Sequence, residues 1–172
     1  MPTVDDVPAP TADLARARAL AAAVPDPEIP VLTIDDLGVL RDVTREDDGT
    51  VVVRITPTYS GCPAMDTIKA DVLEALRRSG FSRLRVDLVL SPAWTTDWMS
   101  ENGRRKLAEY GIAPPATESE RRAGPVSLTL GRRCPQCGSL DTEQLSRFGS
   151  TACKSLWRCR ACAEPFDHFK TL

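Results

Sequence analysis

The sequence is poor in aromatic residues, has a single histidine and contains no long apolar run. Only 5% of its 172 residues are aromatic, so a core must be built mainly from aliphatic side chains. No apolar stretch approaches the roughly 18 residues that a membrane-spanning helix needs, and the first residues are too acidic for a secretory signal. These absences exclude an integral membrane protein. They predict a cytoplasmic protein whose cysteines stay reduced.

Several signatures of common enzymes and nucleic-acid binders are also missing. The net charge is −2, without the strong basic stripe that is typical of nucleic-acid binders, so no nucleic-acid partner is expected. The chain has no P-loop, no dinucleotide fingerprint and no GxSxG elbow. The histidine, His168, is far along the chain from the lone N-terminal cysteine, Cys62, which argues against a hydrolase that pairs a cysteine with a histidine.

Hydrophobic periodicity predicts an α+β body. The pattern gives a helix over 12–24, strands over 39–44 and 51–56, a helix over 63–79, a strand over 83–90 and a helix over 100–110. This order predicts a two-layer α/β sandwich, with helices on one face of a small mixed sheet. Trp94 and Trp98, spaced by four, are expected to share a helical face, with core packing as the default.

Prolines, glycines and charges divide the chain into parts. Residues 1–11 are expected to form a flexible arm, residues 12–112 the α+β domain, residues 113–125 a linker and residues 126–172 a small separate unit.

The C-terminal unit contains five of the six cysteines. Cys134 and Cys137 form one CxxC pair, and Cys159 and Cys162 form another, with 21 residues between the pairs. Four thiolates in this pattern can complete a tetrahedral zinc shell, and so small a unit needs such a staple. We therefore expect a zinc ribbon with a structural Zn²⁺; a redox pair or a cluster site is the alternative.

Two further residues of this unit have open roles. Cys153 is surplus to the four ligands; it could exchange with one of them, or it could be a free thiol. His168 lies six residues after Cys162, too late for a neat knuckle position, and is expected to be a surface histidine that binds no metal.

The body offers a second candidate site. Cys62 follows a predicted strand and precedes Pro63, which is well suited to the first helical position. This places Cys62 at the N-cap, where the positive helix end favours thiolate. The thiol could then be a metal ligand or a nucleophile, or it could be a buried inert cysteine.

Two carboxylates form the other candidate. Prolines around Asp26 and Glu28 predict an extended segment whose carboxylates point the same way. They could face a hard cation or dock a partner, and a solvated acidic loop is the alternative.

These motifs resemble two known families. The N-terminal part resembles the iron–sulfur cluster assembly domain, long described as a domain of unknown function, through Asp26-Pro27-Glu28-Ile29-Pro30, Asp36-Leu37-Gly38-Val39, and Thr56-Pro57-Thr58 followed by Cys62-Pro63. The whole chain from about residue 14 is similar to the PaaD (PaaJ) subunits of bacterial phenylacetyl-CoA epoxidase systems. The residues that carry this likeness are 91–98, 111–115, 134–137, 148–154 and 164–167.

The resemblance implies a role in aerobic phenylacetate catabolism. Such systems epoxidise the ring of phenylacetyl-CoA with a di-iron oxygenase, fed with electrons from NADPH through a reductase that carries flavin and a [2Fe–2S] cluster. The PaaD-like subunit is implied to be an accessory factor that assists assembly of an iron–sulfur or iron centre, with the reductase as the favoured client. A non-catalytic structural subunit of the oxygenase complex is the alternative. One histidine could not supply the repeated Glu-x-x-His ligands of a di-iron site, so we do not expect a catalyst in its own right.

The resemblance also assigns residues. The family's reactive cysteine corresponds to Cys62, and its acidic motif to Asp26 and Glu28, with Thr58 as a further candidate. Its zinc ligands correspond to the two CxxC pairs, and Cys153 lies in a matched motif, which favours a role for it. A transient iron–sulfur cluster would need more ligands than one Cys62, and therefore a homodimer or a site shared with the client.

Overall fold

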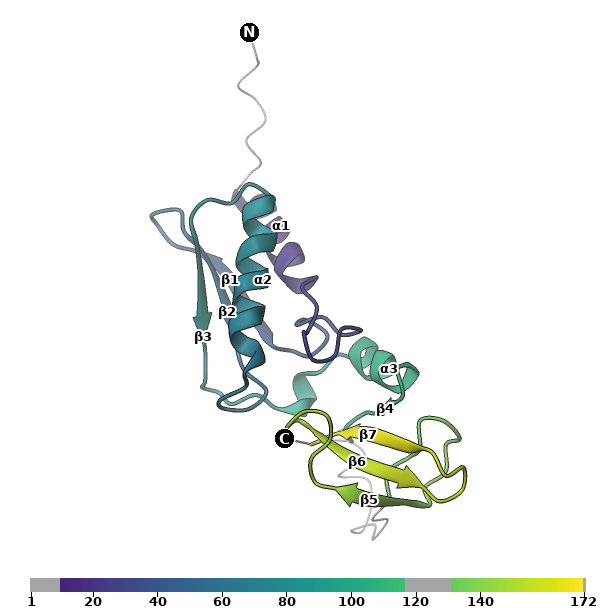
Figure 1. Ribbon diagram of the computed structural model, residues 1–172. Helices are drawn as coiled ribbons and strands as arrows, with labels where there is room; N and C mark the ends of the chain where they lie inside the picture. The colour runs from purple at the N-terminus through teal and green to yellow at the C-terminus, as the bar shows by residue number, and fades with distance from the viewer. Residues whose placement is uncertain (1–9, 117–130, 172) are drawn as a thin grey trace.

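A mixed α+β body is followed by a small β unit in the computed structural model (Figure 1), which describes residues 10–116 and 131–171. The body's elements are α1 (Pro10–Ala22), β1 (Leu40–Arg45), β2 (Val51–Ile55), α2 (Ala64–Arg78), β3 (Leu84–Leu88), the 3₁₀ turn η1 (Thr96–Trp98) and α3 (Glu101–Glu109). The second unit is built from β4 (Ile112–Ala113), β5 (Thr142–Ser146), β6 (Lys154–Cys159) and β7 (Pro165–Phe169). None of the helices among these residues is long and apolar enough to cross a bilayer.

The first sheet has the order β1-β2-β3. β1 and β2 form an antiparallel hairpin, and β3 runs parallel to β2 after the crossover through α2. One row of this sheet, Val43, Val53 and Val86, faces the side that α1 and α2 cover. The predicted two-layer arrangement and order of elements are therefore confirmed for this part of the chain (Figure 1).

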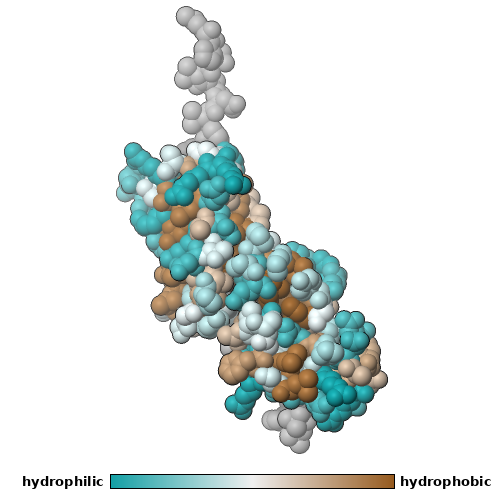
Figure 2. Space-filling view, viewed as in Figure 1, coloured by the Kyte–Doolittle hydropathy of each residue, from teal (hydrophilic) through white to brown (hydrophobic). Residues whose placement is uncertain are grey.

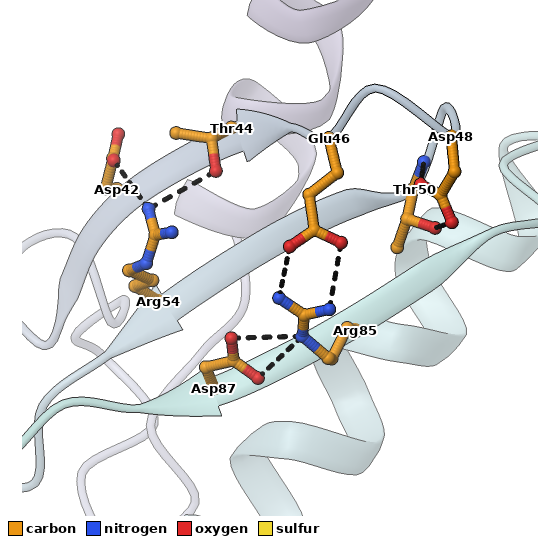
Figure 3. Close-up of polar contacts among 8 residues, drawn as sticks. All are labelled: Asp42, Thr44, Glu46, Asp48, Thr50, Arg54, Arg85 and Asp87. Carbon is orange, nitrogen blue, oxygen red and sulfur yellow. Dashed lines mark hydrogen bonds and ion pairs between the residues drawn. The ribbon is translucent and has the colours of Figure 1, made fainter.

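The other face of the same sheet is covered by paired charges (Figure 3). The Arg85 guanidinium donates to both carboxylate oxygens of Glu46, at 2.6 and 2.9 Å, and its Nε donates to Asp87 at 3.0 Å. Val52 points to this face and is nevertheless fully buried. Long charged side chains can cover apolar surface with their stems, which explains how this face stays polar without exposing valine. Figure 2 shows polar and hydrophobic side chains interspersed over the visible face of the molecule.

The second sheet has the order β4-β7-β6-β5. β4 comes directly after α3, yet it pairs in parallel with β7, through Ile112 with Asp167 and Ala113 with His168. α3 contacts β4 and does not lie in the helical layer on the first sheet. The segment that directly follows α3 is thus a strand of the second sheet.

Asp36 fixes α3 to the body. Its carboxylate accepts hydrogen bonds from Ser100, Asn102 and Lys106, the last at 2.6 Å. Burial alone would raise the pKa of Asp36, but the Lys106 ammonium and the other donors lower it to about 2. Gly103 is needed at this contact, because a Cβ there would lie 2.7 Å from the Asp36 carbonyl oxygen.

Three side chains of the second unit, those of Ile112, Cys153 and Phe169, lie in the core of the body. Phe169, 1% exposed, and Cys153, 5% exposed, belong to the same buried cluster as the residues of α1, β2 and α2. The rings of Phe169 and Trp94 are 6.1 Å apart, and Trp94 donates its indole N–H to the carbonyl of Leu37 at 2.9 Å. The two units are therefore packed together at the lower end of α2 (Figure 1).

Three local expectations were wrong. Trp94 and Trp98 do not share a helical face, because Trp94 precedes the 3₁₀ turn; Trp94 is in the core, and Trp98 stacks on Arg41 at 3.4 Å. His168 is not at the surface but only 3% exposed. The segment around Asp26 forms a turn and is not extended.

The expected arm and linker lie mostly outside the described residues. Residues 10 and 11 of the arm are helical, and the rest of the arm and residues 117–125 of the linker are not described.

Replacing Phe169 tests whether its ring stabilises the protein by packing between the two units. We expect Phe169→Ala to lower the free energy of unfolding by about 3–5 kcal/mol, because a buried phenylalanine is lost and a cavity is left. Phe148→Ala is the matched control, since Phe148 is 67% exposed and should cost less than about 1 kcal/mol. Urea unfolding measures both; equal losses would contradict the packing described here.

Candidate functional site

The four cysteines of the CxxC pairs converge in the second unit. Their sulfur atoms all lie within 4.8 Å of one another, with 3.8 Å between Cys134 and Cys162 and 3.5 Å between Cys137 and Cys159. A tetrahedral zinc ion with Zn–S bonds of about 2.3 Å would set its sulfur neighbours about 3.8 Å apart. The donor set and its spacing therefore fit a zinc ion, which these four residues would hold.

The local backbone prepares these thiols for metal binding. The turn after the first pair needs Gly138, which has φ of +75°. Backbone N–H groups of Cys162 and Ala161 donate to Cys159, and this lowers the pKa of its thiol to about 7 despite its burial. Trp157 and Phe166 pack against the group and complete a small core of its own. The arrangement is that of a closed, structural metal site.

A second group of functional side chains surrounds a small cavity where the body meets the second unit. The cavity measures about 10 Å³, about the room that one water molecule needs. Its polar and thiol-bearing lining residues are Asp26, Glu28, Thr58, Cys62 and Cys153. The structure thus brings the four candidates of the N-terminal domain together and adds a cysteine from the second unit.

Asp26 organises the loop after α1. Its Oδ1 accepts hydrogen bonds from the N–H groups of Glu28, at 2.9 Å, and Ile29, at 2.8 Å. These bonds fold the segment into a turn, because an aspartate side chain can take the place of a backbone acceptor; this overrides the extended form that the prolines suggest. Burial raises the pKa of Asp26, and burial together with the Asp26 charge raises the pKa of Glu28.

Cys62 lies between β2 and α2, half-buried. Pro63 is assigned as the N-cap of α2, in place of the expected Cys62, but its own dihedral angles are already helical (φ −68°, ψ −20°). The helical backbone therefore begins directly after Cys62. The Ala64 N–H still donates to the thiol, so part of the expected helix-end effect is present. Burial, followed by the charges of Glu28 and Asp26, outweighs it and raises the pKa of Cys62. The expectation of a low thiol pKa was therefore wrong.

Cys153 enters this cavity from the turn that precedes β6. Its sulfur lies 4.0 Å from Oε2 of Glu28 and 3.0 Å from the hydroxyl of Thr151. Burial raises the pKa of its thiol, with a smaller contribution of the same sign from Glu28. Cys153 is not part of the converging group of zinc-type ligands. Its position next to Glu28 was not anticipated, and the only signal in the sequence is that it belongs to the matched motif 148–154.

His168 lies on β7 away from both groups. Its Nδ1 is 3.4 Å from the Ser155 hydroxyl, and burial, with the nearby Arg132 charge, lowers its pKa to about 4. The imidazole is therefore neutral near pH 7 and is not among the converging metal donors of the described residues.

Two family models match separate parts of the chain. Residues 15–81 match an iron–sulfur cluster assembly protein family, and residues 116–170 match the PaaD zinc beta ribbon domain. The second unit is called the ribbon from here on.

Individual relatives point to the same two families. A protein of Escherichia coli (strain K12), provisionally named as a subunit of 1,2-phenylacetyl-CoA epoxidase, is 51% identical over 154 residues, 90% of each chain. An Fe-S protein maturation auxiliary factor of Porphyromonas gingivalis is 40% identical over 83 residues, 48% of this chain and 78% of that one. A crystal structure of a domain of unknown function from Bacillus anthracis has a TM-score of 0.52 and 30% identity, and it covers 56% of this chain and 92% of its own.

Loss of one ribbon thiol should release the metal. We expect Cys137→Ser, which alters the most exposed ligand, to lower zinc content from one ion per chain and to expose the ribbon to proteolysis, because a structural zinc site supplies folding energy. Cys153→Ser is the control and should keep its zinc, since Cys153 lies outside the group. Elemental analysis of the purified variants measures both, and equal zinc loss would contradict the assignment.

The charge of Glu28 should be measurable at Cys62. Glu28→Gln removes a negative charge that raises the pKa of Cys62, so the thiolate fraction at pH 8 should increase and the pH profile of alkylation should move to lower pH. Glu109→Gln, on the exposed side of α3, should leave the profile unchanged. Alkylation of Cys62, followed by peptide mass spectrometry between pH 7 and 10, gives the two profiles. If the alkylation profile of Glu28→Gln is unchanged, or moves to higher pH, the electrostatic explanation is refuted.

Proposed function

The chain belongs to the PaaD family of 1,2-phenylacetyl-CoA epoxidase systems, and from this premise we propose that it helps to assemble an iron or iron–sulfur centre in a partner subunit. Cys62 acts as a transient thiolate ligand of the cargo, and Asp26 and Glu28 act with it. The observation that carries the proposal is that these three side chains line one cavity in the domain shared with iron–sulfur maturation factors.

The donors suit an iron cargo that must be released again. Thiolate sulfur and carboxylate oxygen together match the intermediate softness of iron(II). Because the pKa of Cys62 is raised, the thiol is protonated when the site is empty and must lose its proton as iron binds. Protonation of the thiol therefore favours release, which is useful in a carrier and unhelpful in a resident metal centre.

The favoured client is the subunit that carries flavin and a [2Fe–2S] cluster, in the cytoplasm. Cargo transfer needs a ligand that a client can reach, and Cys62 is half-buried at the junction of the two units, so transfer requires the junction to open. The ribbon would then be both a structural unit and a cover. A homodimer that shares two Cys62 thiols is an alternative arrangement for holding a cluster.

A purely structural subunit of the oxygenase complex is the second candidate. The observation that favours it is apolar surface at the end of the edge strand β3, where Leu88 is 42% and Leu90 63% exposed. This candidate predicts a stoichiometric complex whose formation does not depend on Cys62.

Cys62→Ser in cells that produce the complete epoxidase system tests the two candidates. We expect the cluster content of the reductase and the epoxidase activity to fall by about tenfold or more, since even groups that only support a metal ligand act on this scale. Ser60→Ala, an exposed neighbour in the same loop, is the control. Unchanged cluster content and activity in the Cys62 variant, with the complex intact, would refute the assembly role and favour the structural one.

A further inference from the structure

Cys153 of the ribbon lies in the cavity that contains Cys62, and we propose that these two thiols together bind one iron(II) ion between the body and the ribbon. The inference rests on the proposed function, because it specifies how the same cavity holds its cargo. It assigns a ligand to the ribbon that is separate from the four zinc-type cysteines.

The backbone around Cys153 holds it against the body. A turn closed by the Lys154 N–H and the Thr151 carbonyl precedes β6, and the Lys170 N–H donates to the Cys153 carbonyl at 2.9 Å. The side chain leaves the ribbon from this turn and is 5% exposed within the core of the body, where its sulfur is 4.0 Å from Glu28. The Cys153 thiol is thus held beside the carboxylate of Glu28, which lies 125 residues earlier in the chain.

The charges around the cavity are consistent with a bound cation. Two thiolates and the carboxylates of Asp26 and Glu28 would exceed the charge of one iron(II) ion. Lys154 supplies a compensating cation: it is 4% exposed, and its charge acts on Asp26, Glu28 and Cys153 alike. Its Nζ lies 3.9 Å from Asp167, too far for a strong pair. Lysine is rarely buried unless it has charged partners, and the carboxylates of Asp26 and Glu28 are such partners for Lys154.

The size of the cavity favours a single ion. A volume of about 10 Å³ accommodates about one water-sized species, and a core of two irons and two sulfides would require the ribbon to move away. In the described part of the chain only the four zinc-type cysteines bring three or more donors within 4.8 Å of one another. Cys62, Cys153, Asp26 and Glu28 line one cavity, but no three of their donor atoms are that close together, so their side chains must rotate to reach one ion.

The binding step is a simple exchange. Each thiol loses one proton to solvent as its Fe–S bond forms, and iron stays in the ferrous state, so no oxidant or reductant is needed. Asp26 and Glu28 are the carboxylates that complete the shell, and the Tyr59 side chain and Lys154 are the other titratable groups that act on the two thiols.

Titration of the zinc-loaded full-length protein with ferrous ion alone, under strict exclusion of oxygen, tests this inference. Iron(II) should not displace the ribbon's zinc, because it binds such sites more weakly. The wild type should take up one iron per chain, with two sulfur neighbours by X-ray absorption at the iron edge. Cys153→Ala and Cys153→Ser should each lose one sulfur neighbour and about tenfold or more in affinity, while retaining one zinc as evidence of folding. Gln144→Ala, on the exposed part of β5, is the control.

The outcomes separate this inference from the proposed function. If both Cys153 variants bind iron with wild-type affinity and sulfur count, while Cys62→Ser does not, the inference is overturned and the function stands. Iron uptake that occurs only when sulfide is also supplied would overturn it as well. Loss of iron in both thiol variants, with normal cluster content in cells that carry Cys62→Ser, would support the two-thiol site and refute the proposed function.

Discussion

The contact that seats the ribbon on the body determines the rest of the arrangement. Phe169 reaches from β7 into the core, 6.1 Å from Trp94, whose own indole is held by the Leu37 carbonyl. This contact fixes the ribbon against the loops at the start of α2, and it thereby places Cys153 beside Glu28 and closes the cavity around Cys62. Without it, the protein would have a zinc ribbon and an assembly-type domain on one chain but no site between them.

The electrostatics of that junction oppose ionisation of its thiols. Burial is the largest cause, and the charges of Asp26 and Glu28 act in the same direction at Cys62. In the ribbon's group of four cysteines, backbone N–H groups favour the thiolate at Cys159, whereas burial and the neighbouring thiols raise the pKa of Cys162. One chain therefore combines four cysteines placed to hold a metal ion in the ribbon with two thiols at the junction, Cys62 of the body and Cys153 of the ribbon, whose pKa values are raised.

Much of this molecule could be predicted from its sequence. Hydrophobic periodicity and turn residues predict the order of the helices and strands in the body. The spacing of the two CxxC pairs predicts that their four cysteines come together. The turn at Asp26 depends on hydrogen bonds to its side chain that the pattern of prolines does not specify. The position of Cys153 depends on packing between segments more than a hundred residues apart, and no local pattern encodes that contact.

The pairing of β4 with β7 also determines which strands of the second sheet have an unpaired backbone edge. β7 is the strand that delivers Phe169 to the core, and a partner chain could pair with its backbone if that edge were free. Ile112 and Ala113 of β4 pair with Asp167 and His168 and occupy that part of the edge instead. The two edge strands of that sheet are β4, which is only two residues long, and β5, which has an irregular register between Gln144 and Ser146. Both features discourage the addition of further strands. The part of β7 next to Phe169 is thereby paired on both sides, by β4 and β6, and is not open to the backbone of another chain.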